Sequence, residues 1–219
     1  MKVIITGSSG MIGKGVLLEC LDSDKIDKVL IINRKSINNQ HPKLKEVLLK
    51  DFTKVETIKE KLRGYDACFY CMGVSALGMD EAVYTKITYD TTEAFANVLH
   101  EVNPNMVFNF VSGVGTNSES STMWQRVKGQ AENVVLNQGF KNAFAFRPGA
   151  IIPERGIKSR TGWYNTMYAI TRPLFPLFKR SKNVTTTTKI GLAMINSLSS
   201  DKKNEVLEPP AINEMASFS

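Results

Sequence analysis

The first 150 residues alternate short apolar runs with segments whose apolar residues recur at helical spacing. The apolar runs are continuous, which is typical of parallel strands buried on both faces of a sheet. Strands are expected at 2–6, 28–33, 44–51, 66–73, 106–113 and 142–149, and helices at 11–21, 54–63, 80–102 and 121–138. This order predicts an α/β fold with an open, doubly wound parallel sheet of strand order 3-2-1-4-5-6.

The remaining residues are less regular. They contain a loop rich in Gly and Arg (153–162), an aromatic segment interrupted by Pro173 and Pro176, a helix at about 186–199 that follows four threonines, and the run "EVLEPP" as one further short strand. We expect a single domain over 1–219, with a core at 1–150. Residues 151–219 would form a small C-terminal cap over the carboxyl edge of the sheet.

Composition indicates an ordinary globular protein, with 42% hydrophobic and 22% charged residues. No run approaches the roughly 18 apolar residues of a membrane span. The start, "MKVIITGSSG", is too short in apolar residues for a secretory signal, so a cytoplasmic protein is expected. The net charge of +7 comes from scattered basic residues without a dense run. This favours a pocket for an anionic small molecule over a nucleic-acid interface.

Cysteine and histidine give no sign of a metal site. Cys68 and Cys71 form a C-x-x-C spacing, but they lie in an expected strand, where residues three apart face opposite sides. Cys20 has no partner in sequence, and His41 and His100 are far apart without companion ligands. We therefore expect neither a disulfide framework nor a bound metal.

Three glycines stand between the first expected strand and the first expected helix. Gly7, Gly10 and Gly13 occur in "TGSSGMIG", the place where a dinucleotide pyrophosphate meets a helix N-terminus. Glycine lets the backbone approach phosphates and lets helix and strand pack closely. The alternative is a tight turn without a ligand, but the position between strand and helix favours dinucleotide binding.

The second expected strand ends in "IINRK". A site for NAD usually has a carboxylate here for the ribose 2′-hydroxyl, whereas this chain has Asn33, Arg34 and Lys35. A guanidinium is suited to a phosphate monoester. The pattern favours NADP(H) over NAD(H), with ordinary exposed basic residues as the alternative.

The motifs "TGSSGMIG", "CFYCMG", "NFVSGVG", "WQRVKGQAE" and "FRPG" resemble, in this order, the short-chain dehydrogenase/reductase superfamily. The resemblance is strongest to its extended and atypical members, the nucleotide-sugar-epimerase-like proteins and the Tat-interacting-protein-like branch, and it covers about residues 1–155. It implies an NAD(P)-binding Rossmann fold and a catalytic Ser with a Tyr-x-x-x-Lys pair. Ser112 matches the serine and Lys128 the lysine, and Gly129 and Glu132 follow the lysine as in the atypical branch.

The same resemblance implies a set of cofactor contacts. Asp51 and Phe52 would lie at the adenine, Cys71 to Gly73 along the cofactor after the fourth strand, and Pro148 with Gly149 beside the nicotinamide. The complete expected set is Gly7, Ser9, Gly10, Met11, Ile12, Gly13, Asn33, Arg34, Lys35, Asp51, Phe52, Cys71, Met72, Gly73, Lys128, Pro148 and Gly149.

Two positions depart from the family pattern. Thr88 stands where many members have asparagine, and Trp124 stands at the tyrosine position. An indole N–H only donates a hydrogen bond and cannot shuttle a proton, and losing a positioned acid/base group costs about 10²–10⁴-fold in rate. Trp124 is expected to stack at the nicotinamide end of the pocket, with a core anchor as the alternative. Tyr164 or Tyr168 could replace the missing phenol, although both fit packing roles better.

These observations leave two functions open. The first is an NADP(H)-dependent oxidoreductase or epimerase-like enzyme that acts on a small carbonyl or hydroxyl substrate, with Ser112, Lys128 and Trp124 at the reacting end. The second is a catalytically inactive protein that senses NADP(H). The apolar stretch "MYAITRPLFPLFK" is expected to form a pocket lid or a homodimer surface.

Overall fold

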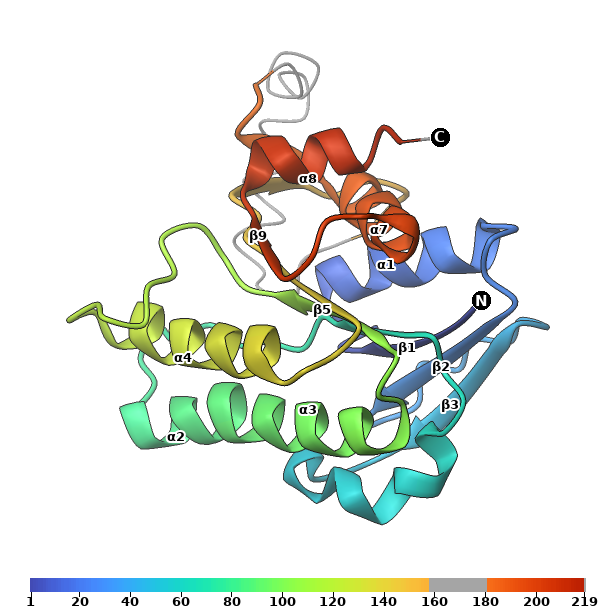
Figure 1. The fold of residues 1–219 in the computed structure, drawn as a ribbon, viewed down its shortest axis with the longest axis horizontal. Coiled ribbons are helices and arrows are strands. Elements are labelled where there is room, and N and C mark those ends of the chain that lie inside the picture. Colours follow the sequence, from blue (N-terminus) through green and yellow to red (C-terminus); the bar gives the residue numbers. More distant parts are fainter. Residues whose placement is uncertain (158–180, 219) are drawn as a thin grey trace.

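A seven-stranded parallel sheet forms the centre of the structure, a computed structural model that describes residues 1–157 and 181–218 (Figure 1). Its strand order is β3-β2-β1-β4-β5-β6-β9. The strands are β1 (Lys2–Thr6), β2 (Lys28–Asn33), β3 (Leu44–Leu48), β4 (Ala67–Tyr70), β5 (Val107–Val111), β6 (Asn142–Phe146) and β9 (Glu205–Leu207). The predicted order 3-2-1-4-5-6 is confirmed, and the run "EVLEPP" supplies the seventh strand.

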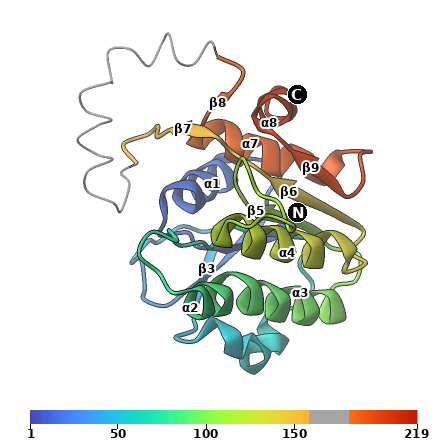
Figure 2. The same cartoon turned by 90° about the vertical axis from the view of Figure 1, so that its left-hand side faces the viewer.

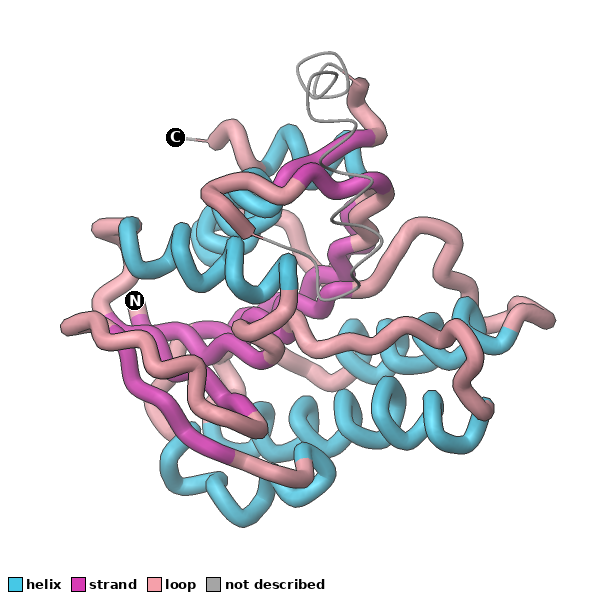
Figure 3. The backbone as a smooth tube through the Cα atoms, turned by 180° about the vertical axis from the view of Figure 1, so that it is seen from behind, coloured by secondary structure: helices cyan, strands magenta, loops and turns pink. Residues whose placement is uncertain are grey.

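Helices cover both faces of this sheet, as seen from the front, the side and behind (Figures 1, 2 and 3). One face carries α1 (Met11–Asp22), α7 (Thr187–Asn196) and α8 (Pro209–Met215); the other carries η1 (Phe52–Leu62), α2 (Glu81–Thr85), η2 (Lys86–Asp90), α3 (Thr91–Val102) and α4 (Met123–Asn137). Each face has its own apolar core, because the central strands are buried on both sides. The arrangement is the doubly wound one expected from the continuous apolar runs.

The helices form where apolar residues return to one face. In α1, Val16, Leu17 and Cys20 are almost fully buried against the sheet, and in α3 the same holds for Phe95 and Leu99. This spacing of three and four residues places one apolar stripe on each helix. The pattern identified the buried face of α1. In the helix expected at 80–102 the apolar residues Val83 and Ile87 lie outside the buried face, which is formed by Tyr84, Phe95 and Leu99.

Two expected helices differ in their internal geometry. The segment expected at 54–63 is the 3₁₀ helix η1, with non-helical backbone at Lys54. The segment expected as one helix at 80–102 contains the π-helical turn η2 between α2 and α3. The Thr91 hydroxyl donates to the Lys86 carbonyl at 2.9 Å, five residues back, and so bonds a carbonyl within the wide turn. Such turns are frequent at functional sites.

The C-terminal segment corrects the expected boundary at residue 150, because much of it belongs to the core. A side chain at Gly15 of α1 would lie 2.7 Å from the Thr187 side chain of α7, and one at Gly191 of α7 would lie 3.3 Å from Val16 Cα. The two helices thus meet at nearly backbone distance, which only glycine permits. Together with β9, α7 completes the sheet and its covering layer rather than forming a cap.

A buried amide fixes α7 further. Asn109, fully buried in the middle of β5, donates from Nδ2 to Ser197 Oγ at 2.7 Å and to the Met194 carbonyl at 3.3 Å. Ser197 begins the short 3₁₀ helix η4 (Ser197–Ser199) that follows α7. A second, two-stranded sheet pairs β7 (Ala150–Ile152), which follows β6 in the chain, with β8 (Val184–Thr186), which precedes α7 (Figure 2). Residues 158–180, which include Tyr164, Tyr168, Pro173 and Pro176, lie outside the described residues.

The cysteines behave as the strand geometry predicts. Cys20, Cys68 and Cys71 are free thiols; Cys68 packs into the core on the α3 face and Cys71 against the core on the α1 face. Within the described residues, no group of His, Cys, Asp or Glu could hold a metal ion. In the same part of the chain, every helix is too short or too polar to cross a membrane.

Candidate functional site

Close backbone contacts shape the turn after β1. Gly7 has φ +68°, and a Cβ at this position would lie 2.6 Å from the Cys71 carbonyl oxygen in the segment after β4. A Cβ at Gly13 would lie 2.3 Å from the Gly7 oxygen, and the Gly10 N–H donates to that same oxygen at 2.8 Å. Each of the three glycines of the motif therefore serves the close approach of the turn to its neighbours.

The N-terminus of α1 has an arrangement suited to an anion. Its N-cap residue, Gly10, provides no side-chain hydrogen bond, and the first turn contains no acidic residue. The first amide groups of a helix lack intrahelical acceptors and carry partial positive charge. This end of α1 fits the pyrophosphate that the glycine motif predicts.

A cavity of about 410 Å³ opens at the carboxyl edge of the sheet beside this turn. Ten of the expected cofactor residues line it: Gly7, Ser9, Gly10, Asn33, Arg34, Asp51, Phe52, Cys71, Met72 and Gly73. Six further lining residues were not expected: Lys50, Thr53, Val74, Lys86, Ile87 and Thr91. The structure thus brings together residues from four separate strand ends and from the π turn.

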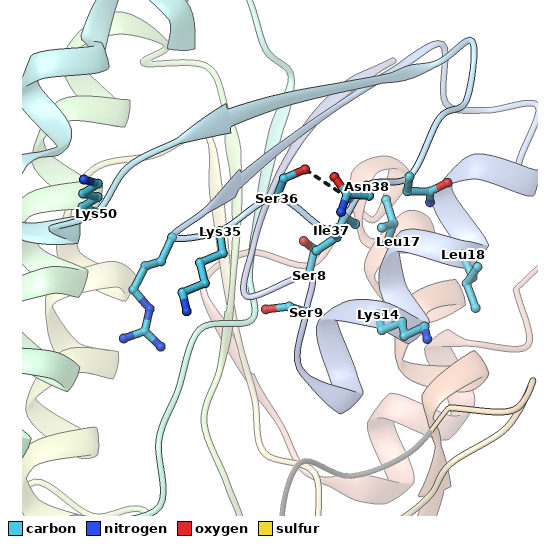
Figure 4. Close-up of a pocket in the computed structure, with 12 residues that line it drawn as sticks. Ser8, Ser9, Lys14, Leu17, Leu18, Lys35, Ser36, Ile37, Asn38 and Lys50 are labelled. Carbon is cyan, nitrogen blue, oxygen red and sulfur yellow. Dashed lines mark hydrogen bonds between the residues drawn. The ribbon is translucent and has the colours of Figure 1, made fainter.

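A second, larger groove of about 1160 Å³ continues from this cavity across the outer side of the turn (Figure 4). It shares Ser9, Arg34 and Lys50 with the cavity and adds Lys14 and Lys35. Arg34, Lys35 and Lys50 are exposed, and none of them forms an ion pair with a carboxylate of the described residues. Their charges remain available to an anionic ligand.

The remaining expected cofactor residues lie elsewhere. Met11, Ile12 and Gly13 form the first turn of α1 without lining either space, and Pro148 and Gly149 follow β6. The Pro148 carbonyl accepts from the Val114 N–H at 3.4 Å, and a Cβ at Gly149 would lie 3.2 Å from the Asn183 oxygen. This joins the segment after β6 to the loop after β5 and to β8.

One acidic residue near the basic cluster was missed by the sequence interpretation. Glu46 lies on β3, beside the end of β2, and accepts from Asn33 Nδ2 at 3.0 Å, from the Ile37 N–H at 3.2 Å and from Ser36 Oγ. Burial alone would raise the pKa of Glu46, but the hydrogen bonds from Ser36, Asn33 and Ile37 outweigh it and lower the pKa. The carboxylate is therefore held ionised close to the predicted 2′-phosphate position.

Ser112 and Lys128 meet at the end of β5. Lys128 Nζ donates to the Ser112 carbonyl at 3.3 Å, and the Ser112 hydroxyl hydrogen-bonds the Thr116 hydroxyl at 2.8 Å. Thr116 in turn donates to the Gly113 carbonyl at 2.7 Å. Burial lowers the pKa of Lys128, and the charge of Glu132 one helical turn away opposes that shift. The serine and lysine suggested by the family pattern are thus adjacent, with Thr116 as an unexpected third member.

Trp124 is partly buried on the first turn of α4, and its ring edge lies near the Gly115 backbone: a Cβ at Gly115 would be 3.7 Å from the indole. It does not line the cavity described above. In the described part of the chain, no tyrosine hydroxyl forms a hydrogen bond with Ser112 or Lys128. The phenol of the family pattern has no described substitute here.

Two contacts fix α4 and therefore Lys128. A Cβ at Gly129 would lie 2.2 Å from the Ser118 nitrogen, so the loop before α4 rests directly on the helix backbone. Arg147, after β6, donates from Nε and Nη2 to both carboxylate oxygens of Glu132, at 2.9 and 2.6 Å. The residues after the lysine thus have structural roles in seating the helix.

Comparison with known proteins identifies the family. The model of the NAD dependent epimerase/dehydratase family matches residues 3–138. The chain belongs to this family. The match confirms the resemblance drawn from the motifs and makes the protein a member of an NAD(P)-dependent, epimerase/dehydratase-like oxidoreductase family.

Relatives of known sequence are similar at a moderate level. Protein HTATIP2 of Rattus norvegicus is 28% identical over 163 residues, 74% of this chain, and the chain spans 66% of that relative's length. Protein FMP52, mitochondrial, of Debaryomyces hansenii is 28% identical over 159 residues, 71% of this chain and 69% of the relative. The first relative confirms the similarity to the Tat-interacting-protein-like branch.

Solved structures share the fold at low identity. The Bordetella bronchiseptica enzyme WbmF, in complex with NAD⁺ and UDP, has a TM-score of 0.72 at 14% identity, covering 98% of this chain and 77% of that one. The dTDP-glucose 4,6-dehydratase DesIV of Streptomyces venezuelae, with NAD bound, has a TM-score of 0.69 at 14% identity, covering 94% and 74%. These neighbours confirm the Rossmann-like architecture.

Proposed function

We propose that this protein binds NADP(H) in the cavity at the carboxyl edge of its sheet and uses it to oxidise or reduce a small carbonyl or hydroxyl substrate. The observation that carries the proposal is the clustering of ten expected cofactor residues around one cavity, beside a helix N-terminus without a side-chain cap. Arg34 and Lys35, exposed and without acidic partners, support the choice of NADP(H) over NAD(H).

Each part of the site has a task in this proposal. The backbone of Gly7 and Gly10 and the N-terminus of α1 hold the pyrophosphate, and Arg34 with Lys35 holds the 2′-phosphate. Lys128 binds the nicotinamide ribose hydroxyls, and Ser112 donates to the substrate oxygen once its hydroxyl turns from Thr116. When bound, the nicotinamide supplies or accepts the hydride. Because Trp124 cannot shuttle a proton, the proton comes from another group or from solvent.

A catalytically inactive NADP(H) sensor is the second candidate. Trp124 at the tyrosine position favours it, because ten of the expected cofactor residues line one cavity while the usual proton-transfer group is missing. Such a protein would bind NADPH at micromolar or lower concentration without turnover, and a partner protein would be recovered with it. Nucleic-acid binding is disfavoured by the scattered basic residues, and the absence of a salt-dependent DNA interaction would exclude it.

Cofactor choice is tested by calorimetric titration of NADPH and NADH into the protein and into Arg34→Ala. A guanidinium on a 2′-phosphate contributes about 1.5–3 kcal/mol, so NADPH is expected to bind about tenfold to a hundredfold more tightly than NADH. Arg34→Ala should remove most of this preference with little change in NADH affinity. Arg63→Ala is the matched control, because Arg63 pairs with Glu60 on η1 away from the cavity. Equal or tighter binding of NADH by the unmodified protein contradicts the assignment.

Catalysis is tested by NADPH consumption against a panel of small aldehydes and ketones, with Trp124→Tyr and Trp124→Phe alongside. The enzyme proposal expects measurable turnover by the unmodified protein. Turnover that appears only in Trp124→Tyr, with Trp124→Phe inactive, identifies the sensor instead, because only the phenol restores a proton donor.

We propose a cytoplasmic protein that forms a homodimer, although the relatives from Debaryomyces hansenii and Candida albicans bear the designation mitochondrial. Cell fractionation with an antibody decides the location, and light scattering after size exclusion decides the oligomeric state. A mitochondrial signal or a monomer would overturn the respective expectation.

A further inference from the structure

A single carboxylate ties together both ends of the turn that carries the basic residues. The turn runs from Asn33, the last residue of β2, to Ile37, and Arg34 and Lys35 lie between them. Glu46 accepts from the Asn33 side chain at 3.0 Å at one end and from the Ile37 N–H at 3.2 Å at the other. The Ser36 hydroxyl donates to the second carboxylate oxygen.

The same network reaches the glycine-rich turn. Asn33 is 3% exposed, and its Oδ1 accepts from the buried Ser8 hydroxyl at 3.0 Å. Because a carboxylate only accepts hydrogen bonds, the Asn33 amide must turn its NH₂ toward Glu46, which leaves its oxygen for Ser8. A continuous set of hydrogen bonds therefore links the phosphate-facing turn, the end of β2 and the edge strand β3.

The network constrains the backbone beyond Ile37 as well. The Asn38 N–H donates to the Ser36 hydroxyl at 3.0 Å, shown as a dashed line in Figure 4, and Asn38 itself has φ +50°. Asparagine adopts this left-handed conformation more readily than most other residues. The Ser36 hydroxyl, which accepts from Asn38, donates to Glu46, so the exposed residue Asn38 is linked to the same network.

We propose that Glu46 is the positioning residue for cofactor selection: by fixing Asn33, Ser36 and Ile37 it presents Arg34 and Lys35 to the 2′-phosphate. The inference rests on the proposed NADP(H) preference and extends it to a residue on another strand. It also explains why an acidic residue beside this site does not serve the ribose 2′-hydroxyl, since Glu46 already accepts from three donors of its own chain.

The test compares two substitutions of Glu46, one that keeps hydrogen-bonding groups for Asn33, Ser36 and Ile37 and one that removes them. Glu46→Gln keeps a carbonyl oxygen for Asn33 and Ile37, and its amide can donate to Ser36, so the turn stays fixed without the charge. Glu46→Ala removes all three acceptor contacts. Glu60→Ala is the control, because Glu60 is an exposed carboxylate on η1 outside the cavity. Each variant is titrated with NADPH and with NADH, and thermal unfolding verifies that it is folded.

If Glu46 positions the basic residues, the two variants should differ in their affinity for NADPH, and NADPH binding should be affected more than NADH binding. Glu46→Ala should raise the Kd for NADPH about tenfold, the equivalent of one charge-assisted hydrogen bond, and change that for NADH by less than about twofold. Glu46→Gln should keep or improve NADPH affinity. If Glu46→Ala leaves NADPH affinity unchanged or tightens it, or weakens both cofactors by the same factor, the positioning role is wrong.

Hydrogen exchange of the cofactor-free protein provides a second readout that separates this inference from the cofactor assignment. In Glu46→Ala the amides of Ile37 and Asn38 should exchange at least about tenfold faster than in the unmodified protein. In Glu46→Gln these two amides should exchange at the rate of the unmodified protein. Unchanged exchange overturns the inference whatever the titrations give. A second outcome is faster exchange in Glu46→Ala together with unchanged NADPH binding in Arg34→Ala. In that case the proposed cofactor preference fails. Glu46 then positions the turn without selecting the cofactor, which also overturns the inference.

Discussion

Replacing Arg147 with methionine should destabilise the protein through the carboxylate that it leaves behind. Arg147 forms two parallel hydrogen bonds with Glu132, whose side chain is 3% exposed, whereas the Arg147 side chain is 20% exposed. Arg147 also lies 3.3 Å from the more exposed Glu208. The two partners are thus unequal: the acid is buried, and the base reaches solvent and a second acid.

The magnitude follows from that inequality. Removing one partner of a buried ion pair costs about 3–5 kcal/mol, and the partial exposure of Arg147 places Arg147→Met near the lower end, at about 3 kcal/mol. For a domain of this size that is a fall in Tm of roughly 6–12 °C. Glu132→Gln should cost only about 1–2 kcal/mol, because Arg147 keeps Glu208 and water as partners.

Urea unfolding followed by tryptophan fluorescence measures the free energy of unfolding of both variants in the same buffer. The double variant Glu132→Met with Arg147→Met should recover most of the loss, since no buried charge remains without a partner. Equal losses for Arg147→Met and Glu132→Gln, or a loss below about 1 kcal/mol for Arg147→Met, would refute the reasoning from burial.

Two further predictions concern α4. Gly129→Ala should destabilise the protein by about 1–3 kcal/mol despite the higher helix propensity of alanine, because its Cβ would lie 2.2 Å from the Ser118 backbone nitrogen. Unchanged or increased stability in urea unfolding would contradict this close packing. Lys128→Met should be more stable than the unmodified protein near neutral pH. Burial lowers the folded-state pKa of Lys128, so the unfolded chain binds more protons between that value and about 10.4, and the stability of the unmodified protein rises with pH across this window. The difference between the two should therefore shrink as pH rises in thermal melts, and a constant or growing difference would be evidence against a lowered pKa of this partly buried ammonium.

Much of the fold was predictable because its signals are local. Continuous apolar runs predicted six strands and their order, and glycine at 7, 10 and 13 predicted a turn in which the structure shows close backbone contacts. The family resemblance also supplied Asp51, Phe52 and Cys71 to Gly73 at strand ends around the cavity, whereas their neighbours Lys50, Thr53 and Val74 were not predicted.

The unpredicted features depend on neighbours that are distant in sequence. Glu46 lies 13 residues beyond Asn33, and only the pairing of β2 with β3 brings it beneath the basic turn. Local pattern could not assign α7 to the core either, because α7 packs on α1, which is distant in sequence. The role of Gly15 and Gly191 is seen only when the two helices are in contact. Thr116 beside Ser112 follows from a loop turn that carries no periodic signal.

The packing of α7 on α1 has a consequence for synthesis of the chain. The side of α1 around Gly15 and Val16 is made early, but the helix that covers it begins only at Thr187. At ribosomal rates of about 5–20 residues per second, the interval between the two helices lasts on the order of 10–30 s. During that time α1 can pack against β1 and β2, but its α7 side stays uncovered, so apolar surface of the nascent protein is open to aggregation or to chaperone binding until α7 is made.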